Sequence, residues 1–287
     1  MSGFSLFELK ASFDPLQVSL NFHLMKLLWF QMKFQLIKIK ISFDCQIYSD
    51  PIIKTKILFK VETMIELYLD TADVAEVKRF NQCLPLKGVT TNPSILAKSK
   101  QGLNETLAGM QEALGGTPRF HAQVVSSTVE GMVAEARQLN ELPYDMVVKV
   151  PATETGLAAI KLMKKEGIQV LATAIYSAQQ GFLAALCGAD YLAPYVNRID
   201  AMNGNGVEVV ADLQLLLDQN QLPAKILAAS FKNTQQAMEV MKLGIEAITL
   251  PTDVAAQMFA HPAVIPAVEQ FDKDWKGTFG DKLSFES

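Results

Sequence analysis

The sequence predicts a (β/α)8 barrel that carries one extra helix at its C-terminal end. From Met64 onward, short runs rich in β-branched residues alternate with amphipathic helical stretches, and eight such runs can be identified. Their starts lie about 20 to 35 residues apart, which is the size of a βα unit. Strict alternation of strands and helices implies a parallel sheet, and eight units over about 220 residues fit a closed barrel.

The elements follow one another in a regular order. Each strand is followed by a loop with Thr, Asn, Ser or Asp, and Asn and Pro residues mark helix ends. An open doubly wound sheet is the alternative, but no Gly-x-Gly-x-x-Gly follows any strand, so its dinucleotide-binding form has no support. The predicted strands are Ile65–Leu69, Gly88–Thr91, Phe120–Val124, Met146–Val150, Gln169–Ala174, Tyr191–Val196, Lys225–Ser230 and Ala247–Leu250. The predicted helices between them include Val74–Leu84, Val129–Leu142, Gly156–Glu166, Ala178–Cys187, Val207–Leu217 and Thr234–Leu243.

Two helices are expected after the last strand. Pro251–Ala260 is typical of the final barrel helix, and Ala263–Trp275 is the extra one. An apolar stripe at helical spacing needs a partner, so the extra helix either caps the barrel or docks on another subunit. The stripe consists of Val264, Val268, Phe271 and Trp275.

Residues 1–63 differ in composition from the rest of the chain. They hold half of the 16 phenylalanines and no arginine. Lysines and His23 interrupt the apolar stretch at 20–43, so it lacks the roughly 20 consecutive apolar residues of a membrane span, and it does not resemble a signal peptide. We expect Met64 to be the native start, residues 1–63 to be an artefactual or poorly ordered extension, and residues 64–287 to form the barrel.

Composition narrows the possible partners. A formal net charge of −4 gives no reason to expect nucleic acid or a membrane surface. The three histidines are far apart, with no zinc-ligand spacing, and there is no dense acidic cluster, so neither a metal nor a cofactor is expected. The cysteines are scattered without a CxxC motif and are typical of free thiols in a reducing cytoplasm. They are Cys45, Cys83 and Cys187.

Lys149 is the most informative single residue. It lies in the middle of the predicted strand Met146–Val150, which Pro151 ends. Strands of a parallel sheet are covered on both faces, and burial lowers the pKa of a lysine until its neutral amine can form Schiff bases with carbonyl compounds. The alternative is an edge strand from which Lys149 points into water.

Polar residues gather where the predicted strands end, which is where barrel enzymes build their active sites. Loops are polar in any case, and Asn92 or Asn197 could serve only in turns. Asp70 could cap the next helix, but Asp73 is better placed to do so, which leaves Asp70 free to act near Lys149. The set consists of Asp70, Thr90, Asn92, Gln123, Lys149, Thr173, Tyr195, Asn197, Arg198 and Ser230.

Arg198 and Ser230 suggest an anion. Arginine offers a planar fork to phosphate, and Ser230 precedes a strand-to-helix turn whose backbone N–H groups add positive potential. A salt bridge between Arg198 and Asp200 is the alternative. Because the chain has no Walker loop, we expect a small sugar phosphate and not a nucleotide.

Several motifs together resemble the transaldolase family. The run Gly88-Val89-Thr90-Thr91-Asn92-Pro93-Ser94-Ile95 is similar to its signature, and Val148-Lys149-Val150-Pro151 is similar to its Schiff-base strand. From 64 to about 280 the chain resembles the small bacterial fructose-6-phosphate aldolases. Further matching stretches are Glu66–Thr71, Ala193–Asp200 and Leu227–Lys232.

The resemblance implies a metal-independent class I aldolase that cleaves fructose 6-phosphate to dihydroxyacetone and glyceraldehyde 3-phosphate. Lys149 forms the iminium, and Asp70 holds substrate hydroxyls. Thr90 and Asn92 position the dihydroxyacetone unit. The remaining implied roles are a proton-shuttling water on Gln123, Thr173 and Tyr195, and phosphate binding by Arg198 and Ser230 with Lys232 and Asn197 nearby.

Two positions separate the subfamilies by resemblance. True transaldolases usually place Glu at the position of Gln123 and Phe at that of Tyr195, so this chain has the aldolase pattern. His121 departs from the aromatic usual there, and it either tunes acceptor preference or packs. The family also forms pentameric rings that stack into decamers. Transaldolase activity, or a non-catalytic sugar-phosphate-binding barrel, are the alternatives, and the physiological donor and acceptor stay open.

Overall fold

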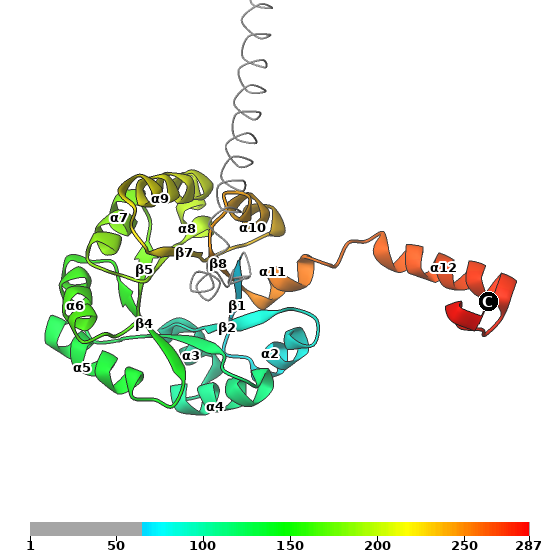
Figure 1. Cartoon of the computed structure of the whole chain (residues 1–287), viewed down its shortest axis with the longest axis horizontal. Coiled ribbons are helices and arrows are strands. Elements are labelled where there is room, and N and C mark those ends of the chain that lie inside the picture. Colours follow the sequence, from blue (N-terminus) through cyan, green and yellow to red (C-terminus); the bar gives the residue numbers. More distant parts are fainter. Residues whose placement is uncertain (1–64, 287) are drawn as a thin grey trace, which may run out of the picture. The chain divides into compact units, whose positions relative to one another are not determined.

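The computed structural model describes residues 65–286, and the expectations for residues 1–63 lie outside that part of the chain. Eight parallel strands pair in sequence order, and β8 pairs with β1, so the sheet closes into a barrel with helices around it (Figure 1). The predicted (β/α)8 fold is therefore confirmed. The strands are β1 Glu66–Asp70, β2 Leu86–Thr90, β3 Arg119–Gln123, β4 Asp145–Pro151, β5 Val170–Ile175, β6 Tyr191–Pro194, β7 Lys225–Ala228 and β8 Ala247–Leu250.

Most of the described helices begin where a loop side chain accepts a free backbone N–H of the first turn, and each such cap stabilises a helix by about 1 kcal/mol. Asp73 accepts from Ala75 N at 2.9 Å, so it is the cap of the first described helix, as predicted. The helices are α2 Val74–Asn81, α3 Pro93–Ser99, α4 Leu103–Leu114, α5 Val129–Asn140, α6 Glu154–Lys165, α7 Ala178–Leu186, α8 Val196–Asp200, α9 Gly206–Asn220, α10 Thr234–Met241, α11 Thr252–Gln257 and α12 Val264–Phe279, followed by a 3-10 turn at Ser284–Glu286.

Two regions differ from the predicted elements. The list of predicted helices leaves the segment between the second and third strands unassigned, and α3 and α4 form there, with Asn92 capping α3 and Pro93 at its first position. The predicted strand Tyr191–Val196 ends at Pro194 instead. The backbone N–H of Val196 donates to the carbonyl of Ala229 at 3.0 Å, and α8 begins at that point.

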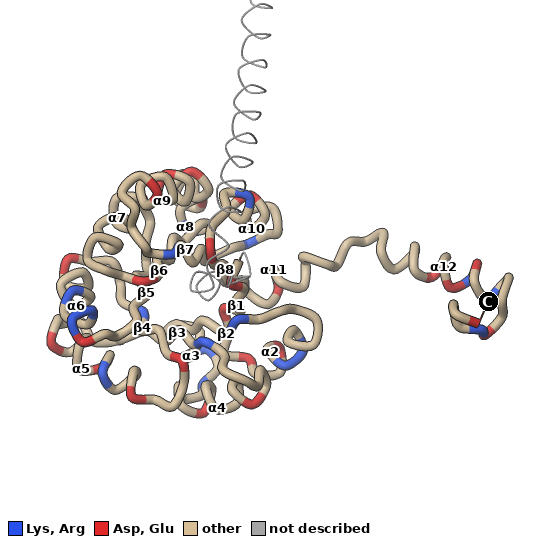
Figure 2. The backbone as a smooth tube through the Cα atoms, viewed as in Figure 1, with Lys and Arg blue, Asp and Glu red and all other residues tan. Residues whose placement is uncertain are grey.

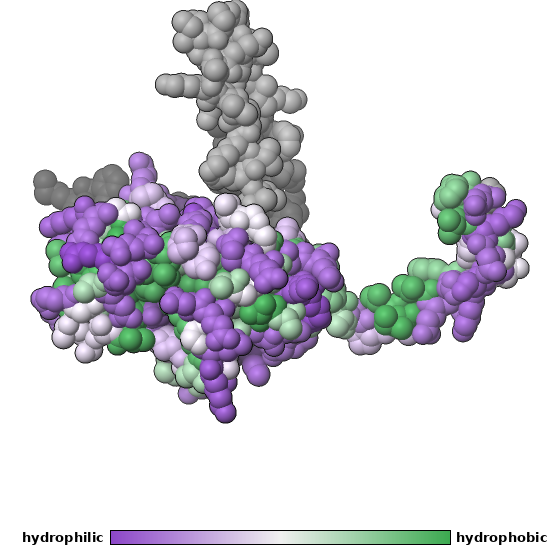
Figure 3. All heavy atoms as spheres, turned by 90° about the horizontal axis from the view of Figure 1, so that it is seen from below, coloured by the Kyte–Doolittle hydropathy of each residue, from purple (hydrophilic) through white to green (hydrophobic). Residues whose placement is uncertain are grey.

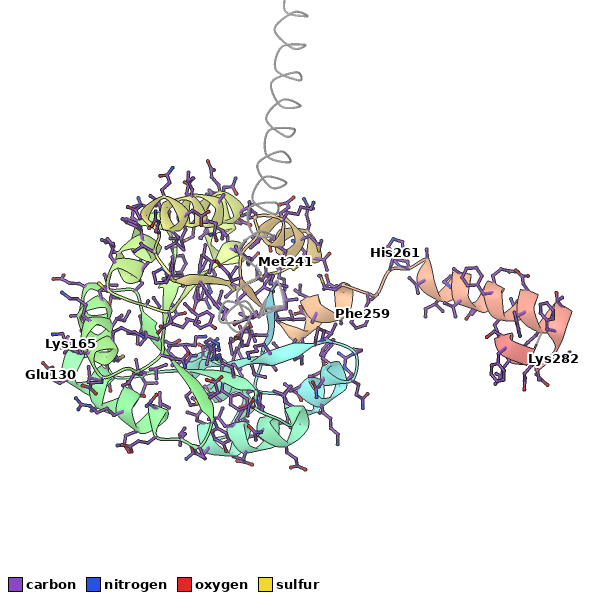
Figure 4. The ribbon with its side chains drawn as sticks, in the orientation of Figure 1. Glu130, Lys165, Met241, Phe259, His261 and Lys282 are labelled. Atoms are coloured by element: carbon purple, nitrogen blue, oxygen red, sulfur yellow. The ribbon has the colours of Figure 1, made fainter. Side chains whose placement is uncertain are left out.

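Apolar side chains form two layers, one inside the barrel and one between the barrel and its helices. On β4, for example, Val147 packs inside the barrel, whereas Val148 packs against the helices. Charged residues lie mostly on the outer helices (Figure 2), and Glu130 on α5 and Lys165 on α6 point away from the barrel (Figure 4). Inward-facing polar residues therefore need a specific explanation.

The amino ends of the strands are closed by a charged cluster. Glu66 accepts from Lys225 Nζ at 2.8 Å and from the hydroxyl of Tyr191 at 2.9 Å. Arg119 donates to the same Tyr191 hydroxyl at 2.7 Å and to Asp145 at 2.9 Å. Two cations and two anions are thus linked through one tyrosine, which satisfies their hydrogen bonding inside the barrel.

The extra helix α12 has its apolar side uncovered. Phe259 and His261 lie in the connection that leads from α11 to α12 (Figure 4), and hydrophobic residues are visible on the surface of α12 (Figure 3). No residue of α12 is buried. The large hydrophobics exposed on it are Val264, Ile265, Val268, Phe271 and Phe279.

Two further findings concern residues 65–286. No helix in this range is long and apolar enough to cross a bilayer. Cys83 and Cys187 are free cysteines.

The charged cluster predicts a difference between two arginines. Arg119→Met leaves Asp145 and Glu66 with less compensation in a largely buried setting, so we expect a loss of roughly 3 kcal/mol in the free energy of unfolding. Arg137 forms an ion pair with Glu166 at 2.6 Å, shorter than the 2.9 Å pair of Arg119 with Asp145, but its side chain is 54% exposed. Arg137→Met is the matched control, with a far smaller expected loss because solvent screens that exposed pair. Urea denaturation measures both, and equal losses would contradict this role of the cluster.

Candidate active site

One polar side chain from nearly every strand reaches the carboxyl end of the barrel. Strand residues alternate between two faces, so residues two positions beyond an interior side chain also point inward. Lys149 follows the interior residue Val147 in this way, and Gln123 follows His121. The residues at this end are Asp70, Thr90, Gln123, Lys149, Thr173 and Thr249 on the strands themselves, with Tyr195 directly after β6 and Ser230 two residues after β7.

Lys149 lies inside the barrel and is only 5% exposed. Its Nζ donates to the backbone carbonyl of Thr91 at 2.7 Å. The alternative of an edge strand facing water is wrong, because β4 pairs with β3 and β5 in a closed sheet. Burial lowers the pKa of the Lys149 amine, and the negative charge of Asp70 partly opposes that effect. Among residues 65–286 the amine forms no salt bridge.

Asp70 faces the barrel and does not cap a helix. It accepts a hydrogen bond from the hydroxyl of Thr90 at 2.7 Å, and Thr90 shares a second hydrogen bond of 2.8 Å with Thr249. Thr90 and Thr249 are both 1% exposed. These two hydrogen bonds hold the Asp70 carboxylate at the mouth of the barrel, where the charge of Asp70 acts on Lys149.

Thr173 and Tyr195 form a hydroxyl pair at the same end. Their oxygens lie 2.8 Å apart, and either can donate. Burial raises the pKa of the Tyr195 phenol, while the hydrogen bond from Thr173 and the charge of Arg198 oppose that rise. A protonated phenol at neutral pH can donate a proton or hold a water molecule.

Arg198 extends the site toward solvent. Its guanidinium lies 4.7 Å from the ring centre of Tyr195, and its Nη1 donates to the hydroxyl of Tyr176 at 3.3 Å. The alternative salt bridge to Asp200 is not found in the described part of the chain. Asp200 instead accepts from Gly206 N at 2.7 Å and from a glutamine of α10. The exposed guanidinium therefore remains open to an anion.

The other predicted site residues differ in their hydrogen bonds and in their exposure. Asn92 uses its side-chain oxygen to accept from Ile95 N at 3.0 Å, so that atom caps α3. Gln123 pairs in register with Lys149, and its amide has no hydrogen-bond partner within residues 65–286. Asn197 is half-buried, and its backbone N–H donates to the carbonyl of Ser230 at 2.7 Å, while Lys232 is exposed.

A cavity of about 570 Å³ adjoins the site at Asp70. Its lining comes from the β1–α2 loop and from α3, including Ile95 and Lys98. Lys149 is not among the residues that line it.

His121 lies inside the barrel, between the rings of Tyr68 and Tyr191, at centre-to-centre distances of 4.9 and 5.3 Å. Burial lowers its pKa well below the usual value, as does the charge of Lys149, so the imidazole is neutral at physiological pH. Neither ring nitrogen has a hydrogen-bond partner among the described residues. His121 therefore packs beneath the polar end of the barrel.

Two residues of this site were missed by sequence reasoning. Thr249 lies on a correctly predicted strand, two residues after the interior Ala247, so strand alternation could have identified it. Tyr176 follows β5, and its contact with Arg198 had no sequence signal.

The arrangement is suited to reactions of carbonyl compounds. A desolvated amine can attack a carbonyl carbon, and hydroxyl groups from several strands can move protons around it. The arginine at the rim can hold an anionic group at the other end of the same molecule.

A family model described as Transaldolase/Fructose-6-phosphate aldolase matches residues 67–284. Among solved structures, a doubly substituted flavocytochrome b2 with sulfite bound is 13% identical, with a TM-score of 0.49. That alignment covers 71% of this chain and 61% of the other chain.

The burial of Lys149 predicts unusual amine reactivity. Its lowered pKa leaves more of the amine neutral at a given pH, so reductive methylation should begin at lower pH than for an exposed lysine, whose pKa is about 10.4. Peptide mass spectrometry over a pH series measures this, with Lys78 on α2 as the internal comparison. Asp70→Asn removes the charge that raises the pKa, so the midpoint for Lys149 should move lower still. An upward shift, or a midpoint equal to that of Lys78, would refute this electrostatic account.

Proposed function

The chain belongs to the transaldolase/fructose-6-phosphate aldolase family, and from this premise we propose that it is a class I aldolase. It cleaves fructose 6-phosphate reversibly to dihydroxyacetone and glyceraldehyde 3-phosphate. The observation that carries the proposal is Lys149, whose buried amine contacts a backbone carbonyl and no carboxylate within the described residues. Such an amine is available in the neutral, nucleophilic form.

Lys149 attacks the C2 ketone, water leaves, and an iminium forms. The positive nitrogen accepts the electron pair of the C3–C4 bond as it breaks, the C4 hydroxyl loses its proton to a bound water, and glyceraldehyde 3-phosphate departs as the aldehyde. Protonation of the resulting enamine and hydrolysis then release dihydroxyacetone and restore the amine. The hydroxyl pair of Thr173 and Tyr195, together with the free amide of Gln123, holds the water that moves these protons. Asp70 and Thr90 bind hydroxyls of the dihydroxyacetone unit, with Asn92 beside the iminium.

The phosphate binds at the opposite end of the substrate. Arg198 supplies an exposed guanidinium beside Tyr195, and Ser230, Asn197 and Lys232 lie on the adjoining turn after β7 or at the start of α8. The hydrogen bond between Tyr176 and Arg198 keeps the guanidinium at the rim. A phosphate dianion bound there by charge-assisted hydrogen bonds would place C2 toward Lys149.

Release of dihydroxyacetone, and not its transfer to a second sugar phosphate, is the preferred outcome. Gln123 and Tyr195 stand where true transaldolases usually carry Glu and Phe, and a phenol can hold the hydrolytic water, whereas a phenyl ring cannot. The hydrogen bond between Tyr195 and Thr173 supports this role.

The active form is proposed to be a cytoplasmic homo-oligomer, a decamer of two pentameric rings by family resemblance. The uncovered apolar side of α12 is consistent with docking on a second copy of the chain. The free thiols of Cys83 and Cys187 are consistent with a reducing compartment.

Borohydride trapping tests the Schiff base directly. In the presence of dihydroxyacetone, reduction should leave a covalent adduct on Lys149 that peptide mass spectrometry can locate. Lys149→Met should reduce cleavage at least about 10⁴-fold, without lowering Tm, because the change replaces a buried amine that is costly to desolvate with an apolar side chain of similar length. Lys165→Met on the outer face of α6 is the control and should behave as wild type. If no adduct forms and Lys149→Met turns over normally, the barrel binds sugar phosphates without this chemistry.

Tyr195→Phe tests release against transfer. Loss of the phenol should slow free release of dihydroxyacetone about 10²-fold, while transfer to erythrose 4-phosphate falls less, so their ratio moves toward transfer. Tyr144→Phe is the control, because Tyr144 packs edge-on against Phe120 away from the site. The assay follows glyceraldehyde 3-phosphate with and without erythrose 4-phosphate. Wild-type transfer much faster than wild-type release would instead make the protein a transaldolase.

A further inference from the structure

Strand β5 contains one extra residue beside the active site. Leu171 and Ala172 pair with consecutive residues of β6, and the next paired residue of β5 is Ile175, opposite Pro194. Three residues of β5 thus advance against two of β6. Such a bulge bends a strand and re-aims a side chain, and bulges are frequent next to active sites.

The extra residue has an unusual backbone. Ala174 has φ of 56°, in the left-handed region that side chains with a β-carbon seldom adopt. Lys100 and Gln221 share this conformation, but both end a helix, where it is common. Ala174 is the second-last residue of β5, and the residues before and after it remain hydrogen-bonded to neighbouring segments. The fold therefore imposes this conformation at a place where a regular strand would not need it.

The bulge changes which face each side chain occupies. Leu171 points into the barrel, and so does Thr173, which contacts Tyr195. In a regular strand Ile175 would also point inward, but it packs in the outer layer against the helices. The backbone N–H of Tyr195 still donates to the carbonyl of Ile175 at 3.0 Å, so pairing with the neighbouring chain resumes after the bulge.

The two sides of the bulge hold the two members of the hydroxyl pair. Before it, the carbonyl of Thr173 accepts from Ala152 N at 2.8 Å, which ties Thr173 to β4. After it, Ile175 holds the backbone of Tyr195. The 2.8 Å contact between the two hydroxyls therefore depends on the chain path through Ala174.

We propose that Ala174 is a positioning residue, whose left-handed backbone sets the Thr173–Tyr195 hydroxyl pair in its working geometry. This inference rests on the proposed function, in which that pair handles the protons of enamine release. Ala174 itself needs no contact with substrate. The proposed role requires only that position 174 hold a residue that tolerates positive φ.

Substitutions at Ala174 separate backbone conformation from side-chain size. Asn tolerates the left-handed region, whereas Thr, of similar size and polarity, does not. We expect Ala174→Gly and Ala174→Asn to keep kcat for fructose 6-phosphate cleavage within about threefold, and Ala174→Thr to lower it by about 10²-fold with KM changed far less. Gln221→Thr places the same strain at the remote end of α9, so it should lower Tm and leave kcat unchanged.

The pH profile gives a second readout. In a plot of kcat against pH, Tyr195→Phe should abolish one limb. Ala174→Thr should shift the pH midpoint of that same limb, while Ala174→Asn should leave the midpoint unchanged. Equal losses in the Asn and Thr variants would indicate simple crowding and overturn the proposal, as would wild-type kcat in Ala174→Thr. If the Thr variant does not fold, the Asn variant decides the question, because a folded Ala174→Asn with a 10²-fold loss also overturns it.

Crystal structures keep this test independent of the reaction. The oxygens of Thr173 and Tyr195 should stay near 2.8 Å apart in the Gly and Asn variants and separate in the Thr variant. If wild-type protein neither cleaves fructose 6-phosphate nor forms an adduct on Lys149, the proposed function fails while these structures still test the bulge. An unchanged separation in Ala174→Thr would refute the positioning role.

Discussion

The site depends on keeping an amine inside a closed barrel without giving it a carboxylate partner. An ion pair would hold Lys149 in its charged form, and full exposure would leave its pKa near the ordinary value. Paired strands flank β4 on both sides, and within residues 65–286 the only hydrogen-bond partner of Lys149 Nζ is the carbonyl of Thr91. Asp70 acts on the amine through its charge, while its own oxygen is engaged by Thr90.

The rest of the fold supports this arrangement from two directions. At the amino ends of the strands, Glu66, Arg119 and Lys225 satisfy one another, which leaves the opposite end as the place for substrate. At the carboxyl ends, departures from regular geometry occur where side chains must be aimed. Ala174 and Ser230 both have positive φ and both border the site. Local strain of this kind persists only where the surrounding structure enforces it.

Schiff-base chemistry is common to both activities of the family, so the amine does not distinguish release from transfer. The distinction depends on what reaches the enamine next. In this chain a phenol that is hydrogen-bonded to Thr173 lies beside an arginine, so the side chain proposed to move protons contacts the one proposed to bind the anion. An anion held by Arg198 would weaken the positive field that opposes the raised pKa of Tyr195. Substrate binding and acid–base behaviour are thereby linked.

Local sequence pattern was sufficient for the barrel, because the alternation of strands and helices and the period of two within strands are short-range properties. It was sufficient as well to place Asp70, Gln123, Lys149 and Thr173 at one end, since each lies at or near the end of a predicted strand. It could not identify the hydrogen bond between Thr90 and Thr249, two residues that lie 159 positions apart in the sequence. That contact exists because β8 pairs with β1 and closes the barrel. Nor could it reveal the bulge at Ala174 or the short helix α8. Those features arise from register between neighbouring strands, and register is set by long-range pairing that no local window of residues contains.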